Sequence, residues 1–561
     1  MTADRAERRK RLGGATRIAA GILSSRVLGL VREAVVAFFF GVGAHADVFR
    51  SAFRAPNLIQ NLLGEQTLSA AFIPVYSRLL GEGRARDAGR FAGAVFGLLL
   101  ASASAVALLG VFLARPLVAV FTPGYLGDGE LLAAGAAAVD RFELAVVGVR
   151  ILFPMTAFLA LAAWTLGVLN SHRRFFLPYF APVLWNAAII GGLLLAGWEF
   201  LTAQSDSPVV PEQNRILVAA FVGGLVGGIL QFAVQLPSAV QSLTGFRPSL
   251  SLAVEGVREA LTNVVPVLAA RGAAQVSSYL DVLLASLLAA GAVGAMGNAM
   301  VLYLLPISLF ALSVAAAELP ELSRRSELAE CGAEARVVHA LRRISFFVVP
   351  TQVGYLAFGF LIVGALYRRG QFGAADNWLV YLVLAAYSLG LVATSWSRLL
   401  INVFYARGET RKPARISIGR MLVSMTIGVA LMFWLDRFGV GDLVAGIGGD
   451  HENLMLGAVG LAIGSAAGAW FEWLRLRFEV RRLGVELAWP TSPTSAAYGR
   501  ALAALALGAA LWFWTRKAPH LIAGGVVVFG YAGAYLALSK LQGVPEVEDV
   551  LRVLRRGDRG G

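Results

Sequence analysis

The sequence predicts an all-α membrane protein that crosses the bilayer about fourteen times. Of its 561 residues, 57% are apolar and 15% are charged, whereas soluble domains carry about 25% charged residues. The mean hydropathy is +0.69. Apolar stretches of roughly 20 residues, the length that spans a hydrocarbon core, recur along the whole chain. Together these observations exclude a soluble multidomain protein.

Short charged or Gly/Pro-rich connections separate the apolar stretches. The first stretch follows a basic head, MTADRAERRKRLGG, which resembles the start of a signal peptide. It is too long and too charged for a cleaved signal and lacks a small-residue cleavage site, so we expect it to stay attached. The predicted spans are residues 16–42, 46–78, 91–114, 141–169, 176–199, 215–242, 258–290, 294–323, 342–367, 377–405, 415–436, 453–474, 497–515 and 520–540.

Charge in the connections predicts the orientation. If the N-terminus is inside, Lys and Arg gather in the inward connections at residues 78–90, 173–174, 247–258, 324–343, 407–420 and 475–482, while the outward ones hold Asp128, Asp206, Glu212, Asp442 and Asp450. The positive-inside rule then places both termini in the cytoplasm. The same loops account for the net charge of +14. We therefore expect contacts with anionic lipid head groups rather than with nucleic acid.

No pattern of residues indicates covalent chemistry. Cys331 is the single cysteine, and the five histidines are scattered one by one, which argues against a disulfide and a metal cluster. Phosphate-binding loops, nucleophile elbows and HExxH motifs are absent from the sequence. The sequence therefore predicts neither an enzyme nor a bound cofactor.

Polar residues follow one helical face in the span 46–78. They recur at spacings of three or four, and they are Asp47, Arg50, Arg54, Asn57, Asn61 and Glu65. In a soluble protein such a stripe is usually a solvated face. Within a bilayer, ionisable groups that face lipid are costly, so we expect the stripe to line a water-filled cavity.

Further charges lie inside other predicted spans. The span 16–42 holds Arg26, Arg32 and Glu33, and the span 258–290 places Arg271, Gln275 and Ser278 on one face, with Asp281 beyond; Arg150 and Arg398 lie in two further spans. Internal salt bridges, such as Asp47 with Arg50 or Arg54, are one interpretation. The arginines outnumber the acids, however, and an excess of guanidinium groups in an aqueous pocket suits a phosphate or diphosphate. We therefore favour a transporter with a cationic cavity.

Several long strings resemble the MurJ/MviN family, the lipid II flippases of the MOP transporter superfamily. They are SRVLGLVRE (residues 25–33), ADVFRSAFRAPNLIQNLLGE (46–65), LNSHRRFFLPYFAPVLWN (169–186), LYRRGQF (366–372) and FYARGETRKP (404–413). They occur in the family's order and extend over nearly the whole chain.

The resemblance implies two six-helix lobes in a V around a central cavity, plus two further helices that form a groove for the lipid tail. The division would be a basic terminus (1–15), an N-lobe (16–245), a C-lobe (246–485), the groove (486–543) and a cytoplasmic tail (544–561). It also implies that lipid II moves from the inner to the outer leaflet of the bacterial cytoplasmic (inner) membrane by alternating access. The partners would be lipid II, membrane lipids and the cell-wall synthesis machinery. The coupling ion, Na⁺ or H⁺, and the membrane potential stay open as driving forces.

Carried over by motif, the family's functional positions fall on Arg26, Arg32, Glu33, Asp47, Arg54 and Glu65. With the residues on the same faces, the predicted substrate-binding set is Arg26, Arg32, Glu33, Asp47, Arg50, Arg54, Asn57, Asn61, Glu65, Arg271 and Gln275. Arg26 and Arg32 lie about 120° apart on a helix, and we favour Arg32 as the phosphate contact.

The sequence departs from the family where further arginines are expected, at Gln60, Asn61 and Val301. Arg271 could supply the missing charge of the second lobe, or it could pair with Asp281. These departures leave two alternatives: a flippase for another polyprenyl-diphosphate saccharide or a cation-coupled exporter, and a cell-wall scaffold without transport. A scaffold has no reason to keep unpaired arginines in a bilayer.

Overall fold

The computed structural model describes residues 2–202, 210–315, 318, 330–444, 454–482 and 491–548. These residues form helices joined by short connections, with one isolated β-bridge between Gly439 and Met455. The chain divides into two compact units, Met1–Gly294 and Ala295–Gly561. Residues 549–561 of the predicted cytoplasmic tail lie outside the described residues.

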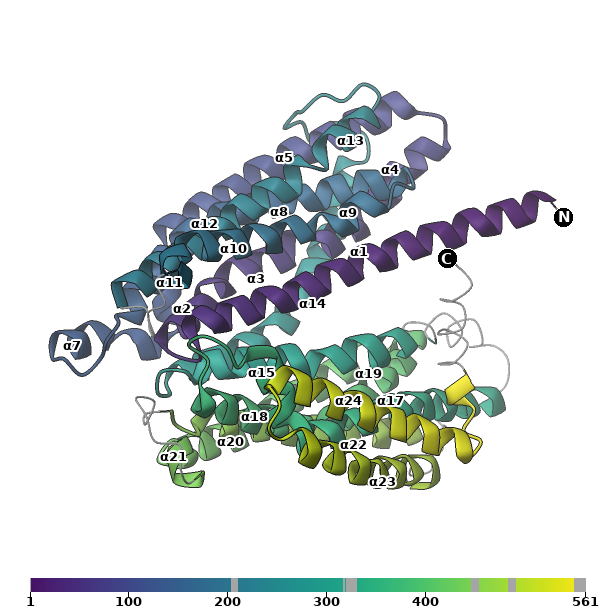
Figure 1. Ribbon diagram of the computed structural model, residues 1–561. Coiled ribbons are helices and arrows are strands. Elements are labelled where there is room, and N and C mark those ends of the chain that lie inside the picture. Colours follow the sequence, from purple (N-terminus) through teal and green to yellow (C-terminus); the bar gives the residue numbers. More distant parts are fainter. Residues whose placement is uncertain are drawn as a thin grey trace. The chain divides into compact units, whose positions relative to one another are not determined.

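Long helices build the first unit, and Figure 1 shows α5, α8, α10 and α12 running side by side. Short helices interrupt them at the ends. The elements are α1 (Thr2–Phe40), α2 (Ala44–Ala52), α3 (Arg54–Leu63), α4 (Glu65–Gly81), α5 (Ala85–Phe112), α6 (Ala114–Phe121), η1 (Pro123–Tyr125), α7 (Asp128–Ala133), α8 (Arg141–Ser171), α9 (Phe176–Phe180), α10 (Pro182–Ala196), α11 (Trp198–Thr202), α12 (Val210–Ala233), α13 (Leu236–Gln241) and α14 (Val257–Ser286).

The predicted span 46–78 is divided into α2, α3 and α4. Pro56 lies in the first turn of α3 and has no amide hydrogen to continue a helix from α2. At Gly64 the backbone is extended, and a Cβ there would lie 2.3 Å from the Gln60 carbonyl oxygen. The polar stripe therefore falls on three helices rather than on one continuous face.

Aromatic rings and glycines form the core between α2, α8 and α12. Phe49 stacks on Phe221 with ring centroids 6.4 Å apart. A Cβ at Gly148 would lie 2.6 Å from the Phe221 ring, so α8 and α12 approach closely because this position is glycine. Phe49, Phe53 and Phe221 are all at most 7% exposed.

A glycine stripe on α5 holds the segment between α13 and α14 against it. Cβ atoms at Gly89, Gly93 and Gly97 would lie 2.0, 2.1 and 2.2 Å from the carbonyl oxygens of residues 244, 247 and 249. We call residues 243–256 the strap. Arg84 donates to both oxygens of Glu255 at the end of the strap, and this hydrogen bonding lowers the pKa of the Glu255 carboxyl. The strap therefore lies backbone to backbone on α5.

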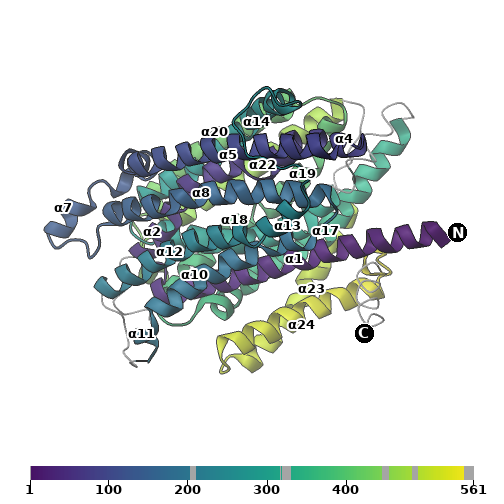
Figure 2. The same ribbon diagram turned by 90° about the horizontal axis from the view of Figure 1, so that it is seen from above.

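The second unit contains α15 (Ala292–Pro306), whose first residues belong to the first unit, and the helices that follow it. These are η2 (Ile307–Ala311), α17 (Glu330–Tyr367), α18 (Ala374–Ser388), α19 (Leu391–Ala406), α20 (Arg411–Leu435), α21 (Val440–Leu443), α22 (Gly457–Arg482), α23 (Thr491–Thr515) and α24 (His520–Leu541). Figure 2 shows α23 and α24, in yellow, lying side by side. Tyr531 and Tyr535 fix α24 to α17 by donating to the carbonyls of Pro350 and Phe346, at 2.9 and 2.8 Å.

One predicted span of the second unit is bent. The axes of α18 and α19 differ by 43° across the break at residues 389–390. Side chains from two other helices bind the carbonyls near this break. Gln352 of α17 donates to Ser388 O at 2.8 Å, and the Trp470 indole of α22 donates to Leu389 O at 2.9 Å.

Within the described part of the chain, nine helices are long and apolar enough to cross a membrane, or ten if α18 and α19 count as one span. They agree with the predicted spans at 91–114, 141–169, 176–199, 215–242, 294–323, 342–367, 377–405, 415–436, 497–515 and 520–540. The multi-span helical fold is confirmed. The total of fourteen crossings and the orientation remain predictions.

Candidate functional site

A buried carboxylate on α1 joins two arginines. The Glu33 carboxylate forms ion pairs with Arg32 of α1 and Arg50 of α2. The side chain of Glu33 is 3% exposed, and those of Arg32 and Arg50 are 18% and 15% exposed. Two guanidinium groups share one carboxylate, so this group of three carries a net positive charge.

Contacts from α10 orient Arg32. Its Nη1 donates to Asn186 Oδ1 at 3.0 Å, and its guanidinium lies 5.0 Å from the centroid of the Trp185 ring. Asn186 is fixed in turn by donating to Pro182 O at 3.1 Å. The Nε–H of Arg32 is buried and has no hydrogen-bond partner. An oriented arginine with a spare donor is suited to an anion.

A second buried carboxylate, Asp47 of α2, caps the first turn of α15. It is fully buried and accepts hydrogen bonds from the amides of Gly291 and Gly294, each at 2.7 Å. Gly291 has no side chain that could bind these free amides itself, so α2 supplies the cap. The Asp47 carboxylate therefore faces backbone amides here, whereas the sequence predicted that it lines an aqueous cavity.

Arg141, the first residue of α8, connects Asp47 to a third buried acid. Its Nε and Nη2 donate to Asp128 at 2.5 and 3.0 Å, and its Nη1 lies 3.5 Å from Asp47 Oδ2. The guanidinium also stacks on Tyr125, 4.4 Å from the ring centroid. The Tyr125 hydroxyl lies 2.9 Å from Ser51 Oγ. We call Asp47, Asp128, Arg141 and Tyr125 the outer cluster.

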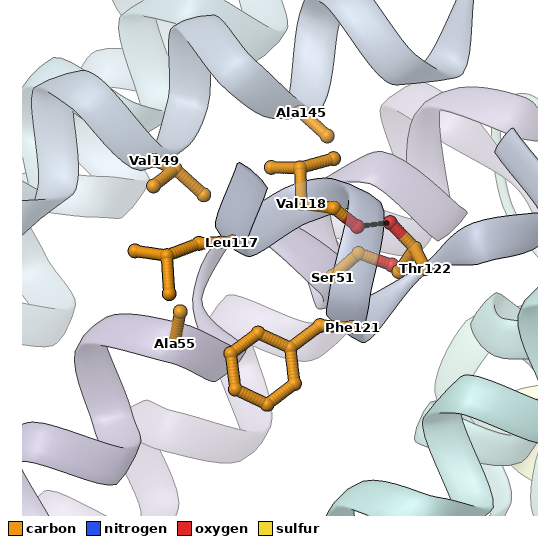
Figure 3. Close-up of a pocket in the computed structure, with 8 residues that line it drawn as sticks. All are labelled: Ser51, Ala55, Leu117, Val118, Phe121, Thr122, Ala145 and Val149. Carbon is orange, nitrogen blue, oxygen red and sulfur yellow. Dashed lines mark hydrogen bonds between the residues drawn. The ribbon is translucent and has the colours of Figure 1, made fainter. Parts of the chain in front are cut away.

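A small pocket adjoins the outer cluster through Ser51. It lies between α2, α3, α6 and α8 with a volume of about 10 Å³, and Figure 3 shows it lined mostly by apolar side chains, with Ser51 and Thr122 as its polar residues. Thr122 donates to Val118 O at 2.8 Å and so satisfies its own hydroxyl. A volume of this size has room for about one water molecule and is far below that of organic-ligand sites, which enclose about 300–1,000 Å³.

The remaining predicted residues lie at different depths. Arg26 is exposed on α1, Asn57 is half-buried on α3 and Asn61 is exposed near the end of α3. Arg54 is half-buried, and its carbonyl accepts from the Tyr279 hydroxyl of α14 at 3.1 Å. The side chains of Glu65, Arg271 and Gln275 lie outside the described residues. The structure therefore brings Arg32, Glu33 and Arg50 together, and places Asp47 in a separate cluster.

Besides Tyr125, four residues in or beside these clusters were not among the predicted site residues. Asn186 and Trp185 end one of the motif strings, which could have marked them. Asp128 was placed in an outward connection, and Arg141 begins a predicted span, so neither stood out from an ordinary helix-end charge. Among the described residues, groups of three or more His, Cys, Asp and Glu that could hold a metal are absent.

Comparison with known families gives a match over most of the chain. The family model described as "Lipid II flippase MurJ" matches residues 36–449. The lipid II flippase MurJ of Burkholderia cenocepacia is 30% identical over 440 residues, which cover 77% of this chain and 80% of that protein. The probable lipid II flippase MurJ of Haemophilus influenzae is 30% identical over 501 residues, covering 88% and 90%.

Solved structures share the fold. The structure titled "Lipid II flippase MurJ, inward closed conformation" has a TM-score of 0.68 at 21% identity, covering 93% of this chain and 98% of that chain. An inward-facing multidrug resistance MATE transporter of the MOP superfamily has a TM-score of 0.55 at 16% identity, covering 82% and 96%. At these identities the likeness concerns the fold alone.

Proposed function

Because the chain belongs to the lipid II flippase MurJ family, we propose that Arg32, Glu33 and Arg50 form the phosphate-binding part of its site. The protein is a multi-pass membrane transporter and not an enzyme, and its function is that of a lipid II flippase. The substrate is therefore a lipid with a saccharide joined to a polyprenyl chain through a diphosphate. What remains to be proposed is how this chain holds and moves it.

The observation that carries the proposal is the spare Nε–H of Arg32. This donor is buried without an acceptor, although Glu33, Asn186 and Trp185 fix the rest of the guanidinium. An orphaned buried donor is costly, and a phosphate oxygen would satisfy it. The net positive charge that Arg32 and Arg50 leave beside Glu33 would attract a diphosphate.

The other predicted residues have supporting roles in this proposal. Arg26, Arg54, Asn57 and Asn61 would contact the diphosphate or saccharide along α1 and α3. Glu65 and Asp47 would take part in closure rather than in anion binding, since a carboxylate repels phosphate. Arg271 and Gln275 of α14 would supply the positive partner that Gln60, Asn61 and Val301 do not provide.

We further propose fourteen crossings with both termini in the cytoplasm, two six-helix lobes and a tail groove formed by α23 and α24. The basic inward connections support this orientation. The location would be the bacterial cytoplasmic membrane, and transport from the inner to the outer leaflet would follow alternating access. Membrane lipids would surround the protein, and cell-wall synthesis enzymes would use the product.

Substitution of Arg32 tests the site. In a strain depleted of its own flippase, Arg32→Gln should abolish growth and lower lipid II binding by the purified protein by about tenfold or more, because a charged hydrogen bond contributes about 1.5–3 kcal/mol. Arg150→Gln, which changes an exposed arginine on α8, is the matched control and should leave both unchanged. Normal growth and binding with Arg32→Gln would contradict the assignment.

A further inference from the structure

The outer cluster holds more negative than positive charge. Asp47 and Asp128 are 0% and 2% exposed, and Arg141 is 9% exposed. One guanidinium therefore serves two buried carboxylates, and Tyr125 adds no charge. The amides of Gly291 and Gly294, at the positive end of the α15 helix dipole, compensate for the excess on Asp47.

This compensation depends on the first turn of α15 staying in place. The hydrogen bonds from the Gly291 and Gly294 amides to Asp47 are non-covalent, so they can break and form again when α15 moves. If Asp47 lost both amides while still buried, its charge would be left uncompensated, which strongly disfavours that state. A proton, water or a cationic partner would then have to compensate for the carboxylate.

Arg141 is placed for that purpose. Its Nη1 points to Asp47 Oδ2, the same oxygen that accepts from Gly291, but at 3.5 Å instead of 2.7 Å. The other side of the guanidinium donates two hydrogen bonds to Asp128, and its flat face stacks on the Tyr125 ring. A shift of less than 1 Å would bring Nη1 to the usual distance of a charged hydrogen bond, about 2.7–2.9 Å.

We propose that Arg141 is a positioning residue of the transport cycle: it takes over the Asp47 carboxylate whenever the α15 amides release it, so that the exchange requires neither a proton nor a cation at this site. The inference rests on the proposed alternating access, because only a protein that changes conformation needs to release this contact. Glu33 and Arg50, on the other carboxylate site, have no part in the exchange.

A reporter cysteine measures the release directly. Ala46 is 3% exposed and a Cβ on Gly294 would lie 3.1 Å from its own Cβ, so α15 covers it. In full-length protein with Cys331→Ser, Ala46→Cys should react with a membrane-impermeant thiol reagent, in spheroplasts, only in the state in which Asp47 has left the amides. The labelling rate then reports how often that state occurs.

Arg141→Gln should lower this labelling rate by at least about tenfold, because the carboxylate that leaves the amides would then have no counter-ion. Adding Asp47→Asn should restore the rate to within about twofold of Asp47→Asn alone, since no uncompensated charge remains. Arg141→Lys keeps the positive charge, so its labelling rate should lie between those of the parent protein and Arg141→Gln. Unchanged or faster labelling in Arg141→Gln would overturn the proposal.

A structural role for Arg141 gives a different pattern. If Arg141 only held Asp128 in place, Asp128→Asn would reproduce the loss and Asp47→Asn would not rescue it, and that result would also overturn the proposal. Arg115→Gln is the control, because the exposed Arg115–Glu143 pair lies on α6 and the same first turn of α8. Its labelling should match that of the parent protein. These measurements need no lipid II, so a failure of the Arg32 assignment would leave their outcome intact.

Discussion

Gly93 allows a direct test of how the strap is held on α5. A Cβ at this position would lie 2.1 Å from the carbonyl oxygen of Arg247 and 2.6 Å from its carbonyl carbon. Both atoms belong to the backbone, so rotation of a side chain cannot relieve the clash. Gly93→Ala must therefore displace the strap or α5, and overpacking of this kind costs about 1–3 kcal/mol.

The measurement is the free energy of unfolding of the purified protein in detergent, followed by helical circular dichroism in denaturant. Gly93→Ala should lower the free energy of unfolding by about 1–3 kcal/mol. Gly191→Ala is the control, since a Cβ on this helical glycine of α10 meets nothing within 4 Å. That variant should instead gain about 0.5–1 kcal/mol, because alanine loses less backbone entropy in a helix. Equal stability of the two variants would refute the close approach of strap and helix.

Three further predictions concern other parts of the chain. Glu472→Gln should lower the free energy of unfolding by about 3 kcal/mol, since it removes the buried carboxylate that Arg420 contacts at 2.7 Å. Trp396→Phe should cost about 1–2 kcal/mol in the same assay, because it removes a buried indole hydrogen bond of 3.0 Å to a serine hydroxyl. In a cysteine-free background, Asn61→Cys should react with a water-soluble thiol reagent while Ala55→Cys, at a position 5% exposed, should not; equal reaction rates would contradict the orientation of α3.

Much of the fold could be predicted because hydropathy is a local signal. Ten predicted spans agree with helices or a bent helix pair long and apolar enough to cross a membrane. Pro56 and Gly64 are residue types that interrupt helices, whereas the three- and four-residue spacing of the polar stripe predicts one continuous face. A regular spacing indicates a continuous face only if the helix itself continues, and proline and glycine interrupt it here.

The candidate sites were predictable only in part. Charges within apolar spans marked Arg32, Glu33, Arg50 and Asp47, because such charges are costly unless they are satisfied. Their partners could not be inferred in the same way. The carboxylate of Asp47 is bound by backbone amides some 240 residues further along the chain. Almost every residue has a backbone amide, so the residue types do not indicate which amide will bind the carboxylate.

The bend between α18 and α19 has a consequence for the energy of straightening that span. Ser388 and Leu389 carbonyls that a continuous helix would use internally are bound by Gln352 and Trp470 from two neighbouring helices. If the two helices became collinear, each carbonyl could return to an amide of its own helix, and the two side chains would need new acceptors. The exchange conserves the hydrogen bonding of the two carbonyls, so the energy of straightening depends on whether Gln352 and Trp470 find other acceptors. Two side-chain hydrogen bonds, from Gln352 and from Trp470, therefore hold the bend. Removing either donor should make the span easier to straighten.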